Sequence, residues 1–272
     1  MRFNRRQILQ SVGALPPLAM LGASGRLIAA PSADPYVAAG IAMEDNRVWT
    51  MVSVNGAPPR FFWFDTGAWS SFISEDYARA AGLERKGTTI VGGVGGQRNA
   101  DVYRAKKVEI GGAFHIDGMG FAAIDWMNGT TIDDTAGIIG GGLFMDRDSD
   151  LDLIKGEWRI YPKGRQSRDG YYPIPDSFKG DKVHGFMQAD GHVGGFDGTF
   201  MLDTGAPGWA FLDKKGSEKS GLWTSGQPYA PTQSRGFGRG GVPTRLYRLD
   251  RMKLYKFVLQ NPLVAVTNPS VG

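Results

Sequence analysis

An internal repeat constrains the fold of this chain more than any other feature of its sequence. The segment Phe64-Asp65-Thr66-Gly67-Ala68 returns 138 residues later (203 − 65) as Leu202-Asp203-Thr204-Gly205-Ala206. Further pairs follow in the same order at nearly the same spacing: Phe72-Ile73 with Phe211-Leu212, Gly82-Leu83 with Gly221-Leu222, and Val102-Tyr103-Arg104 with Leu246-Tyr247-Arg248. Ordered matches of this kind indicate duplication of a unit of roughly 100 to 130 residues, within the usual size range of a domain.

The duplicated unit is expected to consist mainly of β-strands. Short apolar runs predict strands over residues 48–54 and 61–64. Asn55-Gly56 predicts the turn between them, and Asp190-Gly191 is its expected counterpart before the second motif. A short helix is predicted over residues 74–81, from a serine N-cap to the glycine that follows.

A polar segment is predicted to join the two copies. Residues 162–170 carry no periodic apolar side chains, which is typical of a linker. The linker separates a first lobe over residues 36–161 from a second lobe over residues 171–272. Glycine makes up 40 of the 272 residues, about twice its usual share, and this excess indicates many turns and close backbone approaches.

The basic charge of the chain is concentrated at its N-terminus. The net charge is +4, but the first 30 residues hold four arginines and no acidic residue. The remainder therefore balances 27 basic residues (31 − 4) against 27 acidic ones, which gives no reason to expect a nucleic-acid partner. The absence of cysteine excludes a disulfide framework and a Cys-ligated metal site.

Residues 1–30 have the organisation of an export signal. Paired Arg5-Arg6 precede a short apolar run over residues 12–21, and small residues follow at 29–30. The arginine pair resembles a bacterial twin-arginine signal, whereas the alternative is an ordinary basic first helix. The apolar run is too short to span a bilayer. The sequence thus predicts a periplasmic or secreted protein with no membrane span in its mature chain.

The two repeated motifs place a carboxylate at the end of each of two related strands. Asp65 and Asp203 each follow an apolar strand and precede a glycine, which allows close backbone approach. If pseudo-symmetry brings the two carboxylates together, they cannot both ionise freely. The pair then shares one proton. One can then act as a general base and the other as a general acid on a water held between them.

These residues resemble the aspartic proteases. Alanine after each Asp-Thr-Gly, at positions 68 and 206, resembles the retropepsins more than pepsin. The glycine-rich segment Ile90–Gly96 resembles the tip of a retroviral protease flap. Residues 134–144 resemble the segment that crosses behind the catalytic loop before a short helix, and residues 150–161 resemble the closing strands of a lobe.

The resemblance implies an all-β, bilobal acid-protease fold of the pepsin/retropepsin kind, with closed-barrel lobes. It implies roles for the matching positions: Asp65 and Asp203 as the catalytic dyad, Thr66 and Thr204 as the groups that hold it coplanar, Gly67 and Gly205 as backbone contacts to substrate, and Val91, Gly92, Gly93, Val94 and Gly95 as the substrate-binding flap. It implies no cofactor and no metal.

The second copy departs from the family pattern in two places. Its flap equivalent, residues 235–242, carries two arginines, and neither copy has the flap tyrosine of pepsin-like enzymes. The counterpart of Gly137–Gly140 would fall near residue 280, past Gly272. We therefore expect an incomplete second lobe, either because the chain is a fragment, which we favour, or because a partner strand completes it.

Other motifs give weaker alternatives. Gly236, Gly238 and Gly241 match a dinucleotide fingerprint but have flanking prolines in place of a following helix. The histidines at 115, 184 and 192 have no metal-ligand spacing. Aspartates between 146 and 152 lack the glycine and glutamate of a calcium loop. Basic residues between 235 and 251 could favour acidic peptides, but a solvated face is the preferred interpretation.

The sequence thus predicts an exported aspartic endopeptidase that acts on peptides or proteins and is a monomer if full-length. The alternative is a catalytically inactive periplasmic protein that binds peptides or acts as a scaffold on the same fold. The peptide specificity does not follow from the sequence.

Overall fold

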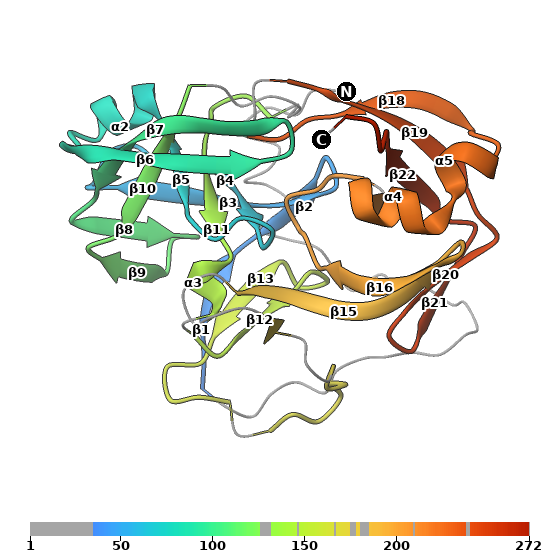
Figure 1. The fold of residues 1–272 in the computed structure, drawn as a ribbon. Coiled ribbons are helices and arrows are strands. Elements are labelled where there is room, and N and C mark those ends of the chain that lie inside the picture. The colour runs from blue at the N-terminus through green and yellow to red at the C-terminus, as the bar shows by residue number, and fades with distance from the viewer. Residues whose placement is uncertain are drawn as a thin grey trace. The chain divides into compact units, whose positions relative to one another are not determined.

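The computed structural model describes residues 35–125, 132–145, 147–165, 167–174, 178–179, 185–208, 210–237 and 240–271. These residues form many β-strands and a few short helices (Figure 1), so the prediction of a mostly β protein is confirmed. They divide into two compact units: unit 1 lies within residues 1–86 and 102–173, and unit 2 within 87–101 and 174–272. The predicted leader, residues 1–30, lies outside the described residues.

Two sheets carry the strands of the first copy. The larger has the order β6-β7-β10-β5-β11-β4-β3-β8-β9, with β2 paired to β3, and the smaller has the order β1-β13-β12. The strands are β1 (Val37–Gly40), β2 (Ala42–Glu44), β3 (Arg47–Val54), β4 (Arg60–Asp65), β5 (Phe72–Ser74), β6 (Arg85–Gly93), β7 (Gly96–Arg104), β8 (Lys107–Ile110), β9 (Phe114–Asp117), β10 (Gly120–Ile124), β11 (Thr135–Gly140), β12 (Ser149–Asp152) and β13 (Glu157–Ile160). The helices are α2 (Glu75–Ala80) and α3 (Gly142–Met145).

Aromatic side chains from distant strands build the core of unit 1. Phe62 and Phe64 on β4 are fully buried, and the Phe64 ring meets the Trp158 ring of β13 edge-on at a centroid distance of 5.3 Å. Burial of each such ring stabilises the fold by about 2 kcal/mol or more. The predicted turn at Asn55-Gly56 is confirmed, and both residues take the positive φ that a tight hairpin turn needs.

Strand β11 lies between β4 and β5 in the sheet. It runs parallel to β4, with Ile139 opposite Phe64 and Gly140 opposite Asp65, and antiparallel to β5. A side chain at Gly137 would overlap the Phe62 ring, so only glycine fits at that point of β11. The predicted crossing segment and the short helix that follows it are both present, as β11 and α3.

Unit 2 repeats the order of these elements. Its strands are β14 (Phe178–Lys179), β15 (Phe186–Val193), β16 (Phe196–Met201), β17 (Ala210–Leu212), β18 (Ala230–Ser234), β19 (Val242–Arg248), β20 (Arg251–Leu254), β21 (Phe257–Gln260) and β22 (Leu263–Thr267), with helices α4 (Lys214–Ser220) and α5 (Leu222–Ser225). β22 runs parallel to β17 and antiparallel to β19, as β10 runs parallel to β5 and antiparallel to β7. This shared pairing pattern confirms the duplication.

The turn predicted at Asp190-Gly191 is wrong. Both residues lie within β15, and Asp190 pairs with Thr199 across the hairpin. The turn is formed by Gly194-Gly195, the true counterpart of Asn55-Gly56. Glycine occurs at 191 for a packing reason, because an added Cβ would lie 2.7 Å from the Lys253 carbonyl oxygen.

The short helix predicted over residues 74–81 is observed as α2. Ser74 occupies the N-cap position, but its hydroxyl makes no capping hydrogen bond. In α4, by contrast, the Asp213 carboxylate accepts a hydrogen bond of 2.8 Å from the Gly216 amide, and left-handed Gly221 ends the helix. No helix in the described part of the chain is long and apolar enough to cross a membrane.

Buried arginines anchor the β12–β13 hairpin. Arg159 pairs with Asp152, with Glu157 at 2.9 Å and with Asp150 at 3.7 Å. Asp150 also binds Arg165, at 2.6 Å, so the segment predicted as a linker is tied to unit 1 at this point. Burial alone would lower the pKa of Arg159, but its hydrogen bond to Glu157 and the nearby carboxylates raise it above its ordinary value.

We predict that Asp150→Asn destabilises the chain by about 3 kcal/mol, because two buried guanidinium groups lose a shared counter-charge. Urea unfolding at neutral pH measures the effect. Glu84→Gln removes a carboxylate from an exposed pair with Lys86 and serves as the control that should unfold like the wild type. Equal stability of the Asp150→Asn and Glu84→Gln variants would contradict the prediction.

Candidate active site

Asp65 stands at the last position of β4, where the strand passes into a tight loop. The Asp65 carbonyl accepts a hydrogen bond of 3.3 Å from the Ala68 amide. Thr66 is almost fully buried, whereas Asp65 and Gly67 are partly exposed. The loop therefore leaves the carboxylate accessible while it buries the neighbouring hydroxyl.

Backbone groups at the end of β11 hold this loop in place. Three glycine amides each donate to it: Gly140 to the Ser71 hydroxyl at 3.0 Å, Gly141 to the Ala68 carbonyl at 2.6 Å, and Gly142 to the Trp69 carbonyl at 3.1 Å. A Cβ on Gly142 would lie 2.8 Å from the Trp69 carbonyl oxygen, and one on Gly140 would overlap the Ser70 carbonyl. Glycine is required here because backbone meets backbone. Sequence analysis did not identify Ser71 as a residue that holds the loop. Its position just after the Asp-Thr-Gly-Ala motif is the signal that could have identified it.

We expect Gly140→Ala to destabilise the chain by about 2 kcal/mol or more, since the new methyl group collides with rigid backbone. The thermal unfolding midpoint reports the loss. A matched alanine substitution at Gly240 has no atom within 4 Å of the new Cβ and should leave the midpoint nearly unchanged. A Gly140→Ala variant as stable as Gly240→Ala would show that β11 does not constrain the loop.

Asp203 follows β16 at the position equivalent to Asp65. The Leu202 amide donates to the Met187 carbonyl at 2.8 Å, which ties the end of β16 to β15. One carboxylate oxygen of Asp203 accepts a hydrogen bond of 2.8 Å from the Gly205 amide. Asp203, Thr204 and Gly205 are all partly exposed. The carboxylate is thus oriented by its own loop.

The predicted flap is a β-hairpin formed by β6 and β7, with its tip at Val94-Gly95. Val91 is buried, whereas Gly92 and Gly93 are exposed. Residues 87–101 belong to unit 2, where the tip packs against the loop between β18 and β19. A Cβ on Gly93 would lie 3.3 Å from the Phe237 side chain, and one on Gly236 would lie 3.0 Å from Val94.

Unit 1 thus positions Asp65, Thr66 and Gly67, while unit 2 positions Asp203, Thr204, Gly205 and the hairpin tip. A pairing of Asp65 with Asp203 would join the two units, and it remains a prediction. Two of the basic residues between 235 and 251 have aromatic partners: Arg245 lies 3.9 Å over the Trp223 ring, and Arg248 lies 5.1 Å over Tyr229. Stacking, rather than solvation alone, holds these guanidinium groups.

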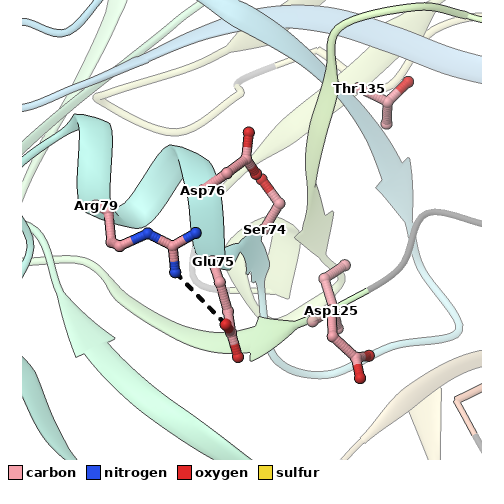
Figure 2. A pocket seen from close by; sticks show the side chains of 7 residues that line it. Ser74, Glu75, Asp76, Arg79, Asp125 and Thr135 are labelled. Atoms are coloured by element: carbon pink, nitrogen blue, oxygen red, sulfur yellow. Dashed lines mark ion pairs between the residues drawn. The ribbon is translucent and has the colours of Figure 1, made fainter.

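A surface pocket in unit 1 lies at the N-terminus of α2 and is lined by none of the predicted site residues (Figure 2). It is lined by Ser74, Glu75, Asp76, Arg79, Ile124, Asp125 and Thr135. Arg79 pairs with Glu75 at 3.6 Å, and Asp76 pairs with Arg60 at 2.7 Å. Across the described residues, no group of three or more His, Asp or Glu side chains is arranged to hold a metal ion.

The Asp76 carboxylate is expected to stabilise the chain in a pH-dependent way. Burial raises its pKa, but the nearby Ser74 hydroxyl and the hydrogen bond and charge of Arg60 outweigh burial and hold the pKa below its ordinary value. Because the folded pKa is depressed, the stabilisation is present above the unfolded pKa of about 3.9 and is lost as the pH falls through the folded value.

Asp76→Asn should therefore cost about 0.5 kcal/mol at pH 7, a value reduced by solvent screening of this exposed pair. The difference from the wild type should shrink as the pH falls below the unfolded pKa and through the lower folded pKa. Urea unfolding from pH 2.5 to 7 measures both stabilities. A difference that stays constant over this range would contradict the assigned charge effect.

Comparison with known proteins gives matches over both copies. The family described as "Aspartyl protease" matches residues 50–142 and 189–272, and each segment contains one Asp-Thr-Gly-Ala motif. No curated protein matches the chain. Similar solved structures include EIAV protease complexed with the inhibitor HBY-793, at 26% identity and a TM-score of 0.30, over 37% of this chain and 86% of that one. A retropepsin-like aspartic protease from Rickettsia conorii is 16% identical with a TM-score of 0.32, over 44% of this chain and 86% of that one.

Proposed function

Because the chain belongs to the aspartyl protease family, we propose that it is an endopeptidase in which Asp65 and Asp203 activate a water against a peptide bond. The observation that carries this proposal is the equivalence of the two aspartates. Asp65 ends β4 and Asp203 follows shortly after β16, and each precedes a corresponding strand and helix, β5 with α2 or β17 with α4. This chemistry needs two carboxylates, and the duplicated strands and loops supply one each.

The proposed reaction starts from a dyad that shares one proton. The ionised carboxylate takes a proton from the water, whose oxygen attacks the peptide carbonyl carbon, while the protonated carboxyl donates its proton to the carbonyl oxygen. The tetrahedral intermediate then collapses: the C–N bond breaks, and the leaving nitrogen takes the proton that the first carboxylate had removed from the water. The second carboxylate recovers a proton from a hydroxyl of the intermediate, so that the dyad again shares one proton. Thr66 and Thr204 are the proposed supports of the two loops, and Gly67 and Gly205 the proposed backbone contacts to substrate.

The β6–β7 hairpin is proposed to close over the bound peptide. Its exposed glycines at 92 and 93 present backbone with no side chain between it and a ligand. Gly95 and Gly96 both have positive φ, which suits a turn that changes shape during closure. An extended, largely apolar peptide segment is the substrate class that such a hairpin fits. Export through the twin-arginine-like leader, and hence a periplasmic or secreted location, is proposed from residues 1–30.

We predict that Asp65→Asn and Asp203→Asn each lower kcat/KM for a peptide substrate by about 10³-fold, because each removes one partner in proton transfer. Mass spectrometry of a peptide library digested between pH 3 and 7 identifies the products and rates. The wild-type rate should follow a bell-shaped curve with a mildly acidic maximum, since one proton must be shared. Asp197→Asn changes a highly exposed carboxylate on β16 and should leave the rate unchanged. Cleavage that persists in both dyad variants would contradict the proposal.

One observation favours a second candidate, a peptide-binding protein without turnover. The segment that corresponds to the flap in the second copy, residues 235–242, carries two arginines, which departs from the family pattern. This candidate predicts peptide binding without any product, at every pH. A product whose formation depends on both aspartates would eliminate it.

A further inference from the structure

Unit 1 contains a second pocket, with a volume of about 380 Å³. This volume falls within the range of pockets that bind small molecules in proteins. The pocket lies between the start of β9, the turn that follows α3 and the end of β13, and none of the candidate site residues lines it. Its lining residues include Phe114, Arg147, Asp148, Ile160, Tyr161 and Pro162.

Apolar side chains form the wall of this pocket. Phe114 is partly exposed, and its ring meets the Trp158 ring edge-on at a centroid distance of 5.3 Å, which fixes the orientation of the Phe114 ring. Ile160 is the last residue of β13 and is almost fully buried, and the ring of Pro162 fixes its own backbone φ angle. This wall can therefore contact an aromatic or branched aliphatic group with little loss of side-chain freedom.

Arg147 supplies a cationic group to the pocket. Its guanidinium carbon lies 5.4 Å from the centroid of the Phe114 ring, and its Nη1 donates a hydrogen bond of 3.3 Å to the Leu143 carbonyl. These two contacts orient the planar guanidinium, and the hydrogen bond uses one of its five N–H groups. Among the described residues, no carboxylate lies within ion-pair distance of Arg147.

The neighbouring carboxylate of Asp148 is engaged elsewhere. It accepts hydrogen bonds of 3.0 and 3.2 Å from the Arg168 guanidinium and one of 2.7 Å from the Arg165 amide. Because Arg168 balances the charge of Asp148, the charge of Arg147 is available to a ligand. The described lining residues thus combine one unbalanced positive charge with an apolar wall.

We propose that this pocket binds an organic carboxylate whose body is aromatic or branched aliphatic. The carboxylate accepts two parallel hydrogen bonds from Arg147, since the planar guanidinium matches its geometry and its single charge. The body of the ligand lies against Phe114, Ile160 and Pro162. Two sources share this chemistry: a free small acid, and the C-terminus of a peptide that ends in an apolar residue.

The pocket at the N-terminus of α2 provides a contrast within the same unit. It also contains an arginine, but Arg79 pairs with Glu75 at 3.6 Å, and Asp76 and Asp125 line the same pocket. This excess of negative charge disfavours a carboxylate there. Arg79 is therefore a matched control for Arg147.

Two acids and their neutral amides test the proposal by calorimetry: 3-phenylpropionate and the dipeptide N-acetyl-alanyl-phenylalanine. Binding is measured on the full chain carrying Asp65→Asn, so that the result does not depend on the proposed peptidase activity. We expect one-to-one binding of at least one acid, with a Kd of about 1 mM or lower. The matching amide, which lacks the charge, should bind at least tenfold more weakly. Tighter binding of 3-phenylpropionate would identify a free acid as the ligand, and tighter binding of the dipeptide would identify a peptide C-terminus.

Variants and NMR spectroscopy locate the site. Arg147→Gln should weaken binding of the acid at least tenfold, whereas Arg79→Gln should leave the affinity unchanged. In the chain that retains Arg147, the acid should shift the backbone amide resonances of residues 114, 160, 161 and 164 and not those of residues 75–79. This measurement keeps the test valid if Arg147→Gln lowers the stability of the chain.

Four outcomes would each overturn the proposal. They are absent binding of both acids, equal binding of the acids and their amides, an unchanged affinity in a folded Arg147→Gln variant, and resonance shifts confined to residues 65–69.

Discussion

The insertion of β11 between β4 and β5 is the contact on which the first copy depends. One strand pairs with both neighbours, buries its isoleucines, and presents consecutive glycine amides to the loop that carries Asp65. Because this arrangement brings β11 and its following turn against the Phe62 ring and against backbone, glycine is required at 137, 140 and 142. The position of the candidate catalytic carboxylate therefore depends on the pairing of β11 with its neighbours.

The two copies use this scaffold unequally. In unit 1 the loop after β4 is held from behind by a neighbouring strand, and in unit 2 the loop after β16 is oriented by a hydrogen bond between Gly205 and Asp203. Membership of the aspartyl protease family accounts for the shared motif.

Much of the fold could be predicted from the sequence because the repeated motifs are short and occur in the same order at nearly the same spacing. Short sequence patterns directly indicate the local backbone conformation at the Asp-Thr-Gly-Ala motifs, the Asn55-Gly56 turn and the crossing segment. The Asp190-Gly191 turn was mispredicted because glycine there relieves a contact with Lys253 from a later strand, which no local pattern reveals. The network around Arg159 and the role of Ser71 depend on pairings between distant segments. For the candidate site, sequence analysis proposed its residues, and the structure added the hydrogen bonds that hold the loops of Asp65 and Asp203.

The hairpin at residues 87–101 has a consequence for how the chain is made. It is encoded within the first copy but packs in unit 2, where Val94 contacts Gly236. During synthesis, the tip emerges 142 residues (236 − 94) before the loop on which it rests. At about 5 to 20 residues per second, the hairpin waits roughly 7 to 28 seconds without its partner. The tip of the hairpin can therefore complete its packing only after residue 236 has appeared.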